Sequence, residues 1–155
     1  WLGAEVTAVC STRNVERVRS LGADHVIDYT RDDFTRSDRR YDLIFDVAGS
    51  RSWRECRRVM KRKAILVIVG APKGGRLLGP MSHMVKLRLA SIGSRRKVSF
   101  FVAKIQKEDL AVLAELMATG KLTPVIERAY PLAETADAMR YLGEGHAQGK
   151  IVVTV

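Results

Sequence analysis

Residues 5–29, EVTAVCSTRNVERVRSLGADHVIDY, have the pattern of a strand, a polar turn, a helix and a second strand. The first apolar run ends at the turn of residues 11–14, after which Val15, Val18 and Leu21 share one face of a helix. Gly22 ends this helix, and a second short β-run follows it. Two short strands joined by a helix of about ten residues are half of a parallel βαβ sheet.

The rest of the chain continues to alternate between β-runs and helical patterns. Further β-runs are predicted at residues 41–47, 64–69, 98–102 and 151–155, and a short extended piece is predicted to begin at 124–126. A capping box at Ser52 opens one helix, and apolar stripes predict two more, over residues 110–117 and 133–142. Residues 30–40 read as a loop with one helical turn, and the helix boundaries within 73–96 stay open. This alternation is typical of the α/β class.

Five segments, taken in order, carry a family resemblance: TAVCST at 7–12, LGAD at 21–24, VIDY at 26–29, YDLIFDVAG at 41–49 and GKIVV at 149–153. Together they resemble the medium-chain dehydrogenase/reductase superfamily, in its zinc-independent quinone oxidoreductase-like branch. The resemblance implies an incomplete Rossmann-type doubly wound parallel sheet that lacks its first strand and Gly-rich loop. It also implies a C-terminal segment that returns to an absent catalytic domain.

On this resemblance, residues 1–120 form a truncated nucleotide-binding domain and residues 121–155 form the return segment. No G-x-G-x-x-G occurs in the chain. In the strand order 3-2-1-4-5-6 the missing strand lies between the strands at 5–10 and 42–47, so these two should not pair with each other. The strand at 151–155 should lie apart from the nucleotide sheet with its hydrogen-bonding partners absent. We expect the isolated chain to be unstable or to aggregate, because backbone groups facing the gap are unsatisfied.

Ligands of open α/β sheets bind at the carboxyl ends of the strands. That rule selects these candidate cofactor-binding residues: Ser11, Thr12, Arg13, Asn14, Tyr29, Ala48, Gly49, Gly70 and Ala71. Phe101 and Val102 resemble the segment whose backbone meets the nicotinamide carboxamide, although core packing remains the simpler explanation for aromatic rings there. Tyr29 resembles the tyrosine beside the adenosine phosphate of the cofactor; a solvated edge residue is the alternative.

The turn at 11–14 favours NADPH over NADH. It offers two hydroxyls, a guanidinium and an amide, with no acid before Glu16, and a 2′-phosphate needs hydroxyl donors together with a guanidinium. In the alternative reading, Ser11 merely caps the helix and Arg13 is exposed to solvent. Relatives often carry Lys where Asn14 stands, so Arg13 would take over that contact.

The resulting functional prediction is an NADPH-dependent oxidoreductase that transfers hydride to a small-molecule quinone, enone or similar carbonyl compound, present here as a C-terminal fragment. No catalytic residue is assigned, because hydride transfer needs mainly alignment of reactants and exclusion of water. The alternatives are a relative of the zinc-type alcohol dehydrogenases and a non-catalytic, cofactor-sensing protein with the same fold.

Composition and charge limit the partners. The net charge is +10, but the basic residues form separate clusters without interleaved aromatics, which argues against a nucleic-acid partner. No apolar run approaches the roughly 20 residues of a membrane span, so no membrane partner is expected. Cys10 and Cys56 read as reduced thiols, no signal peptide is evident, and no zinc-like spacing occurs. These features predict a cytoplasmic protein without zinc in this part; a homodimer of the full-length protein is left open.

Overall fold

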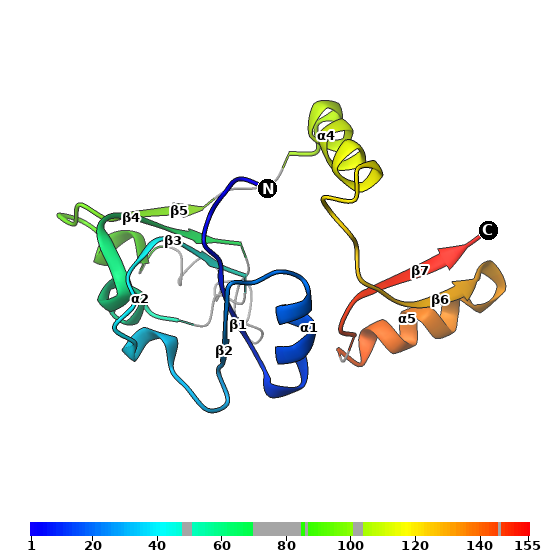
Figure 1. Cartoon of the computed structure of the whole chain (residues 1–155), viewed down its shortest axis with the longest axis horizontal. Coiled ribbons are helices and arrows are strands. Elements are labelled where there is room, and N and C mark those ends of the chain that lie inside the picture. The colour runs from blue at the N-terminus through cyan, green and yellow to red at the C-terminus, as the bar shows by residue number, and fades with distance from the viewer. Residues whose placement is uncertain (48–50, 70–84, 86, 101–103, 146) are drawn as a thin grey trace. The chain divides into compact units, whose positions relative to one another are not determined.

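The computed structural model describes residues 1–47, 51–69, 85, 87–100, 104–145 and 147–155 (Figure 1). The chain divides into two compact units. One unit is residues 5–103, and the other combines residues 1–4 with residues 104–155. The α/β class and the parallel strand pairing predicted from the sequence are confirmed.

The first unit begins with the predicted strand, turn, helix and strand. Strand β1 (Thr7–Cys10) leads through the 3₁₀ turn η1 (Thr12–Asn14) into helix α1 (Val15–Ser20), and strand β2 (His25–Asp28) follows. The two strands pair in parallel, with Cys10 opposite Asp28 at their carboxyl ends. Gly22 has a φ of 94°, a conformation that an L side chain rarely adopts, so glycine ends this helix as predicted.

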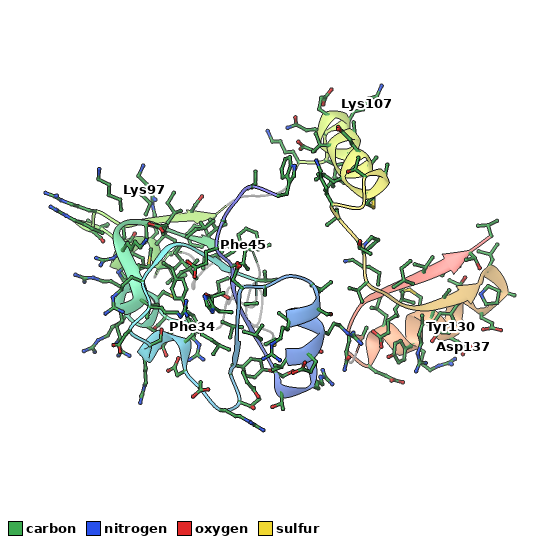
Figure 2. The ribbon with its side chains drawn as sticks, viewed as in Figure 1. Phe34, Phe45, Lys97, Lys107, Tyr130 and Asp137 are labelled. Atoms are coloured by element: carbon green, nitrogen blue, oxygen red, sulfur yellow. The ribbon has the colours of Figure 1, made fainter. Side chains whose placement is uncertain are left out.

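The core of the first unit lies between a three-stranded sheet and helix α2 (Trp53–Val59). The sheet runs in the order β3 (Tyr41–Asp46), β4 (Met60–Ile68), β5 (Lys97–Phe100), all parallel. The buried core consists of Ile44, Trp53, Cys56, Val59, Met60, Ala64, Leu66, Ile68, Leu87 and Val98. Phe34, from the single turn η2 (Phe34–Arg36), packs against its side (Figure 2).

Strand β4 begins earlier than the sequence predicts, at Met60 rather than Ala64. Helix α2 ends at Val59 and Met60 is already extended, so the basic segment after it joins the strand without a loop. The start of α2 is as predicted. The Ser52 hydroxyl accepts from the Glu55 amide at 3.4 Å, and the Glu55 carboxylate accepts from the Ser52 amide at 2.8 Å, which completes the capping box.

Strands β1 and β3 do not pair with each other. Across the described strands, β1 pairs with β2 in one sheet, while β3 pairs with β4 in another. The predicted gap between the strands at 5–10 and 42–47 is therefore confirmed.

The second unit contains helix α4 (Lys107–Ala118) and a compact βαβ arrangement. Strand β6 (Ile126–Pro131) is followed by η3 (Leu132–Glu134), helix α5 (Thr135–Gly143) and strand β7 (Lys150–Thr154). Strand β7 pairs with β6 and, in the described structure, not with β5, as predicted. The expectation that β7 would lack a partner is wrong, because the extended piece predicted at 124–126 is a full strand reaching Pro131.

Glu127 ties the three elements of this arrangement together. Its carboxylate accepts from the Tyr141 hydroxyl at 2.6 Å and from the Gly149 amide at 2.8 Å, and also from the Gln148 amide. The guanidinium carbon of Arg128 lies 4.1 Å from the centre of the Tyr141 ring. The entry into β7 is thereby fixed against β6 and α5.

Replacing Gly149 with alanine is expected to lower the free energy of unfolding by about 1–3 kcal/mol, the usual cost of overpacking. A Cβ atom there would lie 2.6 Å from the Val125 carbonyl oxygen, which itself accepts from the Lys150 amide at 2.7 Å. Urea denaturation followed by circular dichroism measures the effect. Gly143→Ala is the matched control, because a Cβ at Gly143 meets no atom within 4 Å. Equal stability of the two variants would contradict the close approach at Gly149.

Candidate cofactor-binding site

The turn after β1 and the end of β2 lie together at one edge of the first sheet. The Tyr29 amide donates to the Cys10 carbonyl at 2.9 Å, which continues the pairing beyond both strand ends. The hydroxyl oxygens of Thr12 and Thr30 are 2.8 Å apart across this edge. The structure therefore brings the predicted residues of the turn close to the predicted tyrosine segment.

Ser11 does not cap the helix that follows it. Its side chain makes no capping hydrogen bond, and its oxygen accepts from the Asn14 side-chain amide at 3.4 Å. The Ser11 hydroxyl proton is thus available to a ligand. The Oδ1 atom of Asn14 is buried and has no hydrogen-bond partner in the described part of the chain. The turn consequently offers one hydroxyl donor, that of Ser11, which its own backbone does not use.

Arg13 is exposed and forms no ion pair or hydrogen bond with any described residue. Neighbouring arginines differ: Arg19 is paired with Glu16 at 2.5 Å, and Arg31 lies 3.6 Å from Asp28. The exposure of Arg13 fits the solvent-exposed alternative, and it equally leaves the guanidinium open to an anion at this edge.

Asp28 is a site residue that the sequence reasoning missed. Its carboxylate accepts from the Thr12 hydroxyl at 2.6 Å, and from the Thr30 amide at 3.0 Å and hydroxyl at 2.8 Å. These bonds, with the Thr12 bond contributing most, hold the pKa of Asp28 below its ordinary value. The Thr12 hydroxyl is therefore used to fasten the turn to the end of β2. The parallel register, which sets Asp28 opposite Cys10, is the signal that could have revealed this contact.

Tyr29 follows Asp28 and is 55% exposed. Its backbone lies at the same edge as the turn, and its exposure leaves the ring open to a ligand or to solvent.

The carboxyl ends of β3 and β4 also share an edge, since Asp46 and Ile68 are paired in register and the Val69 amide donates to the Asp46 carbonyl at 3.0 Å. The predicted residues that follow these strands and β5 lie outside the described residues: Ala48, Gly49, Gly70, Ala71, Phe101 and Val102. Their part in the site stays a prediction.

The two thiols differ in their surroundings. Cys56 is fully buried, and burial, aided by the charges of Asp46 and Glu55, raises its pKa to about 12. Cys10 is half-buried, and its pKa is raised by burial and by Asp28. Neither forms a disulfide.

No three His, Cys, Asp or Glu side chains of the described residues lie together as a metal site. No helix in the same residues is long and apolar enough to cross a membrane.

Residues 21–153 match the family model described as zinc-binding dehydrogenase. The chain belongs to the medium-chain dehydrogenase/reductase superfamily, in its quinone oxidoreductase-like branch. The resemblance drawn from its sequence motifs is thereby confirmed. The described residues of the chain do not fit a zinc site, so no step is assigned to a metal; the absence of zinc from this part stays a prediction.

Three curated relatives illustrate the branch. A mouse protein named NAD(P)H oxidoreductase RTN4IP1, mitochondrial, is 36% identical over 99% of this chain and 42% of its own length. The chloroplastic quinone-oxidoreductase QR1 of Triphysaria versicolor is 33% identical over 96% of this chain and 44% of its own length. The chloroplastic NADPH-dependent alkenal/one oxidoreductase of Arabidopsis thaliana is 33% identical over 97% of this chain and 33% of its own length.

The fold is shared with solved structures of the superfamily. The quinone oxidoreductase from Coxiella burnetii covers 99% of this chain with a TM-score of 0.77, at 24% sequence identity and over 45% of its own chain. The chain thus spans less than half the length of these relatives. The match supports the predicted Rossmann-type architecture.

The prediction of a cytoplasmic protein is wrong. The relatives named above are chloroplastic or mitochondrial proteins, so reduced thiols and the lack of a recognisable leader pattern were insufficient grounds for a cytoplasmic location.

Proposed function

We propose that this chain is the nucleotide-binding part of an NADPH-dependent oxidoreductase that transfers hydride to a small-molecule quinone, enone or similar carbonyl compound. Residues 1–120 serve as the nucleotide-binding domain in this proposal, and residues 121–155 as the segment returning to a catalytic domain. Support for the reaction class comes from relatives named as quinone and alkenal/one oxidoreductases.

The observation that carries the choice of NADPH is the turn after β1. The Ser11 hydroxyl is free to donate and the Arg13 guanidinium is unpaired in the described structure. A hydroxyl donor beside a guanidinium suits a phosphate monoester, which accepts bidentate, charge-assisted hydrogen bonds.

The carboxylate nearest to this turn, that of Asp28, already accepts hydrogen bonds from the protein. An NAD-binding fold uses an acid after this strand to accept from the free ribose 2′-hydroxyl. Here Asp28 accepts three hydrogen bonds from Thr12 and Thr30, which use much of its capacity. A 2′-hydroxyl would therefore meet a weaker acceptor than a dedicated, unoccupied carboxylate provides.

In this proposal the residues of the chain bind and orient the cofactor, and the nicotinamide supplies the hydride when the cofactor is bound. Ser11 and Arg13 would hold the 2′-phosphate, and Tyr29 would flank it. No general acid or base is assigned to the chain.

Turnover by the complete protein tests the reaction class. NADPH oxidation, followed at the nicotinamide absorbance band, is expected with simple quinones or enones and not with saturated ketones, because conjugation lowers the barrier to hydride addition. NADPH binding without oxidation of the cofactor by any of these acceptors would favour the non-catalytic, cofactor-sensing alternative. Oxidation of simple alcohols with NAD⁺ would instead favour the alcohol dehydrogenase alternative.

A further inference from the structure

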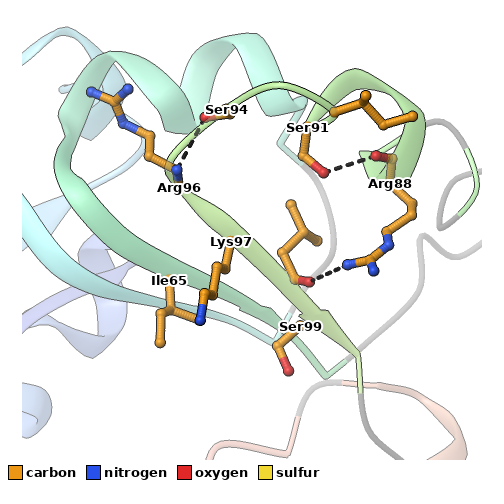
Figure 3. A pocket seen from close by; sticks show the side chains of 9 residues that line it. Ile65, Arg88, Ser91, Ser94, Arg96, Lys97 and Ser99 are labelled. Carbon is orange, nitrogen blue, oxygen red and sulfur yellow. Dashed lines mark hydrogen bonds between the residues drawn. The ribbon is translucent and has the colours of Figure 1, made fainter.

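A hollow lies along strand β5, and none of the residues of the cofactor turn lines it. It encloses about 540 Å³ and is lined by Ile65 of β4 and by residues on and before β5: Arg88, Ser91, Ile92, Ser94, Arg96, Lys97, Val98 and Ser99 (Figure 3). Its volume falls within the roughly 300–1,000 Å³ of pockets that hold small organic ligands.

The arginines of the hollow are fixed by neutral partners. The Arg88 guanidinium donates to the Val98 carbonyl at 3.4 Å (Figure 3). The Arg96 guanidinium donates to the Met60 carbonyl at 3.2 Å and 2.9 Å. A carbonyl holds a guanidinium in place without cancelling its charge. Lys97 adds a third cation, and no Asp or Glu lines the hollow among the described residues.

The chain segment that contains Arg88, Arg96 and Lys97 carries no acidic residue that could neutralise them. Residues 56–107 contain fourteen Lys and Arg residues and no Asp or Glu. Figure 2 shows the nitrogen-tipped side chains that gather around Lys97. The segment that supplies the lining therefore carries only positive formal charges.

Hydroxyl donors complete the polar lining. The Ser94 oxygen accepts from the Arg96 amide at 3.1 Å, which leaves its proton free, and the Ser99 hydroxyl has no partner in the described structure. The Ser91 hydroxyl donates to the Arg88 carbonyl at 2.8 Å. Apolar surface comes from Ile65 and Ile92, which are 37% and 75% exposed.

We infer that this hollow binds a small organic phosphate. Arg88 and Lys97, with the Ser94 and Ser99 hydroxyls, receive the phosphate group, because guanidinium, ammonium and hydroxyl donors match its oxygens. Ile65 and Ile92 receive the apolar part of the molecule. None of the residues of the cofactor turn at 11–14 lines the hollow, so the phosphate site is distinct from that turn.

Phenyl phosphate is a suitable probe, titrated calorimetrically into the complete protein at low salt with the cofactor site saturated by NADPH. Saturable binding is expected, tighter than that of inorganic phosphate because the ring covers the isoleucines. The double variant Arg88→Gln, Lys97→Gln is expected to weaken phenyl phosphate by roughly tenfold or more, since it removes two charge-assisted contacts.

The matched control is Arg54→Gln, Arg58→Gln, which removes the same charge from exposed positions of helix α2 outside the hollow. Its affinity for phenyl phosphate should stay close to that of the wild type. An equal loss in both double variants would overturn the proposal and assign the binding to diffuse charge. Displacement of phenyl phosphate by NADPH, equal affinity for inorganic phosphate, or no saturable binding would each overturn it as well.

Discussion

Replacing Arg13 with alanine is expected to lower kcat/KM for NADPH by roughly 10- to 100-fold, while the value for NADH stays nearly unchanged. The guanidinium is exposed and unpaired in the described structure, so its removal disturbs no internal contact. A charge-assisted hydrogen bond contributes about 1.5–3 kcal/mol, and only the cofactor with a 2′-phosphate can receive it.

The measurement is the ratio of kcat/KM for the two cofactors in the complete enzyme. Arg19→Ala removes the same charge from an exposed position of helix α1 that is paired with Glu16, and should leave the ratio unchanged. Ser11→Asp should shift the ratio further towards NADH than Arg13→Ala does, because the new carboxylate repels the phosphate and accepts from the ribose hydroxyl. If the ratio of kcat/KM for NADPH and NADH is unchanged in Arg13→Ala, the turn does not bind the 2′-phosphate and serves only to start helix α1.

Cys56 is expected to react with iodoacetamide far more slowly than Cys10 in the folded protein. Its pKa of about 12 places its thiolate fraction at neutral pH roughly a thousandfold below that of an ordinary thiol, and the side chain is fully buried. Cys10 is half-buried and also has a raised pKa, so its rate should lie between that of Cys56 and that of an unfolded thiol. Peptide mass spectrometry after timed labelling measures both sites.

Labelling in urea is the control, since both cysteines should then react at similar rates. Similar rates without urea would contradict the core described around Cys56.

The raised pKa of Cys56 should also make the stability of the protein depend on pH in the alkaline range. An unfolded thiol loses its proton near pH 8.5–9, whereas the folded one keeps it to about pH 12, so the free energy of unfolding should fall as the pH rises between these values.

Local chemistry made much of the fold predictable. Gly22 ends helix α1 with a positive φ, and Ser52 with Glu55 forms the capping box that starts α2. Both signals act within a few residues of the chain, so a single sequence contains everything they need. The run from Ala64 to Val69 predicts a buried strand because β-branched residues dominate it, and β4 includes this run up to Ile68.

Pairing between distant segments was harder to predict. Strand β6 carries charged residues and a proline at its end, so only its first residues were recognised as extended. Its stability comes from β7 and from Glu127, whose partners Tyr141 and Gly149 lie far along the sequence. The basic start of β4 was likewise not recognised as a strand, because the fold rather than the local pattern extends it from Met60.

In the candidate site, too, local sequence signals predicted some features, whereas contacts between distant segments were not predicted. Strand ends indicated where a cofactor would lie, and the structure places Ser11 and Arg13 there with free donors. The contact between Thr12 and Asp28 depends on the register of β1 against β2, which no local pattern specifies. Two hydroxyls in the turn therefore have different roles: Thr12 holds the turn, and Ser11 remains open to a ligand.

The most direct test of 2′-phosphate recognition compares two ligands that differ only in that group. Adenosine 2′,5′-bisphosphate and adenosine 5′-monophosphate can be titrated calorimetrically into the wild type and the Arg13→Ala variant. We expect the bisphosphate to bind the wild type roughly 10- to 100-fold more tightly than the monophosphate, and the difference to fall to a few-fold in the variant. Equal affinities of the wild type for the two ligands would contradict NADPH recognition by the turn of Ser11 and Arg13.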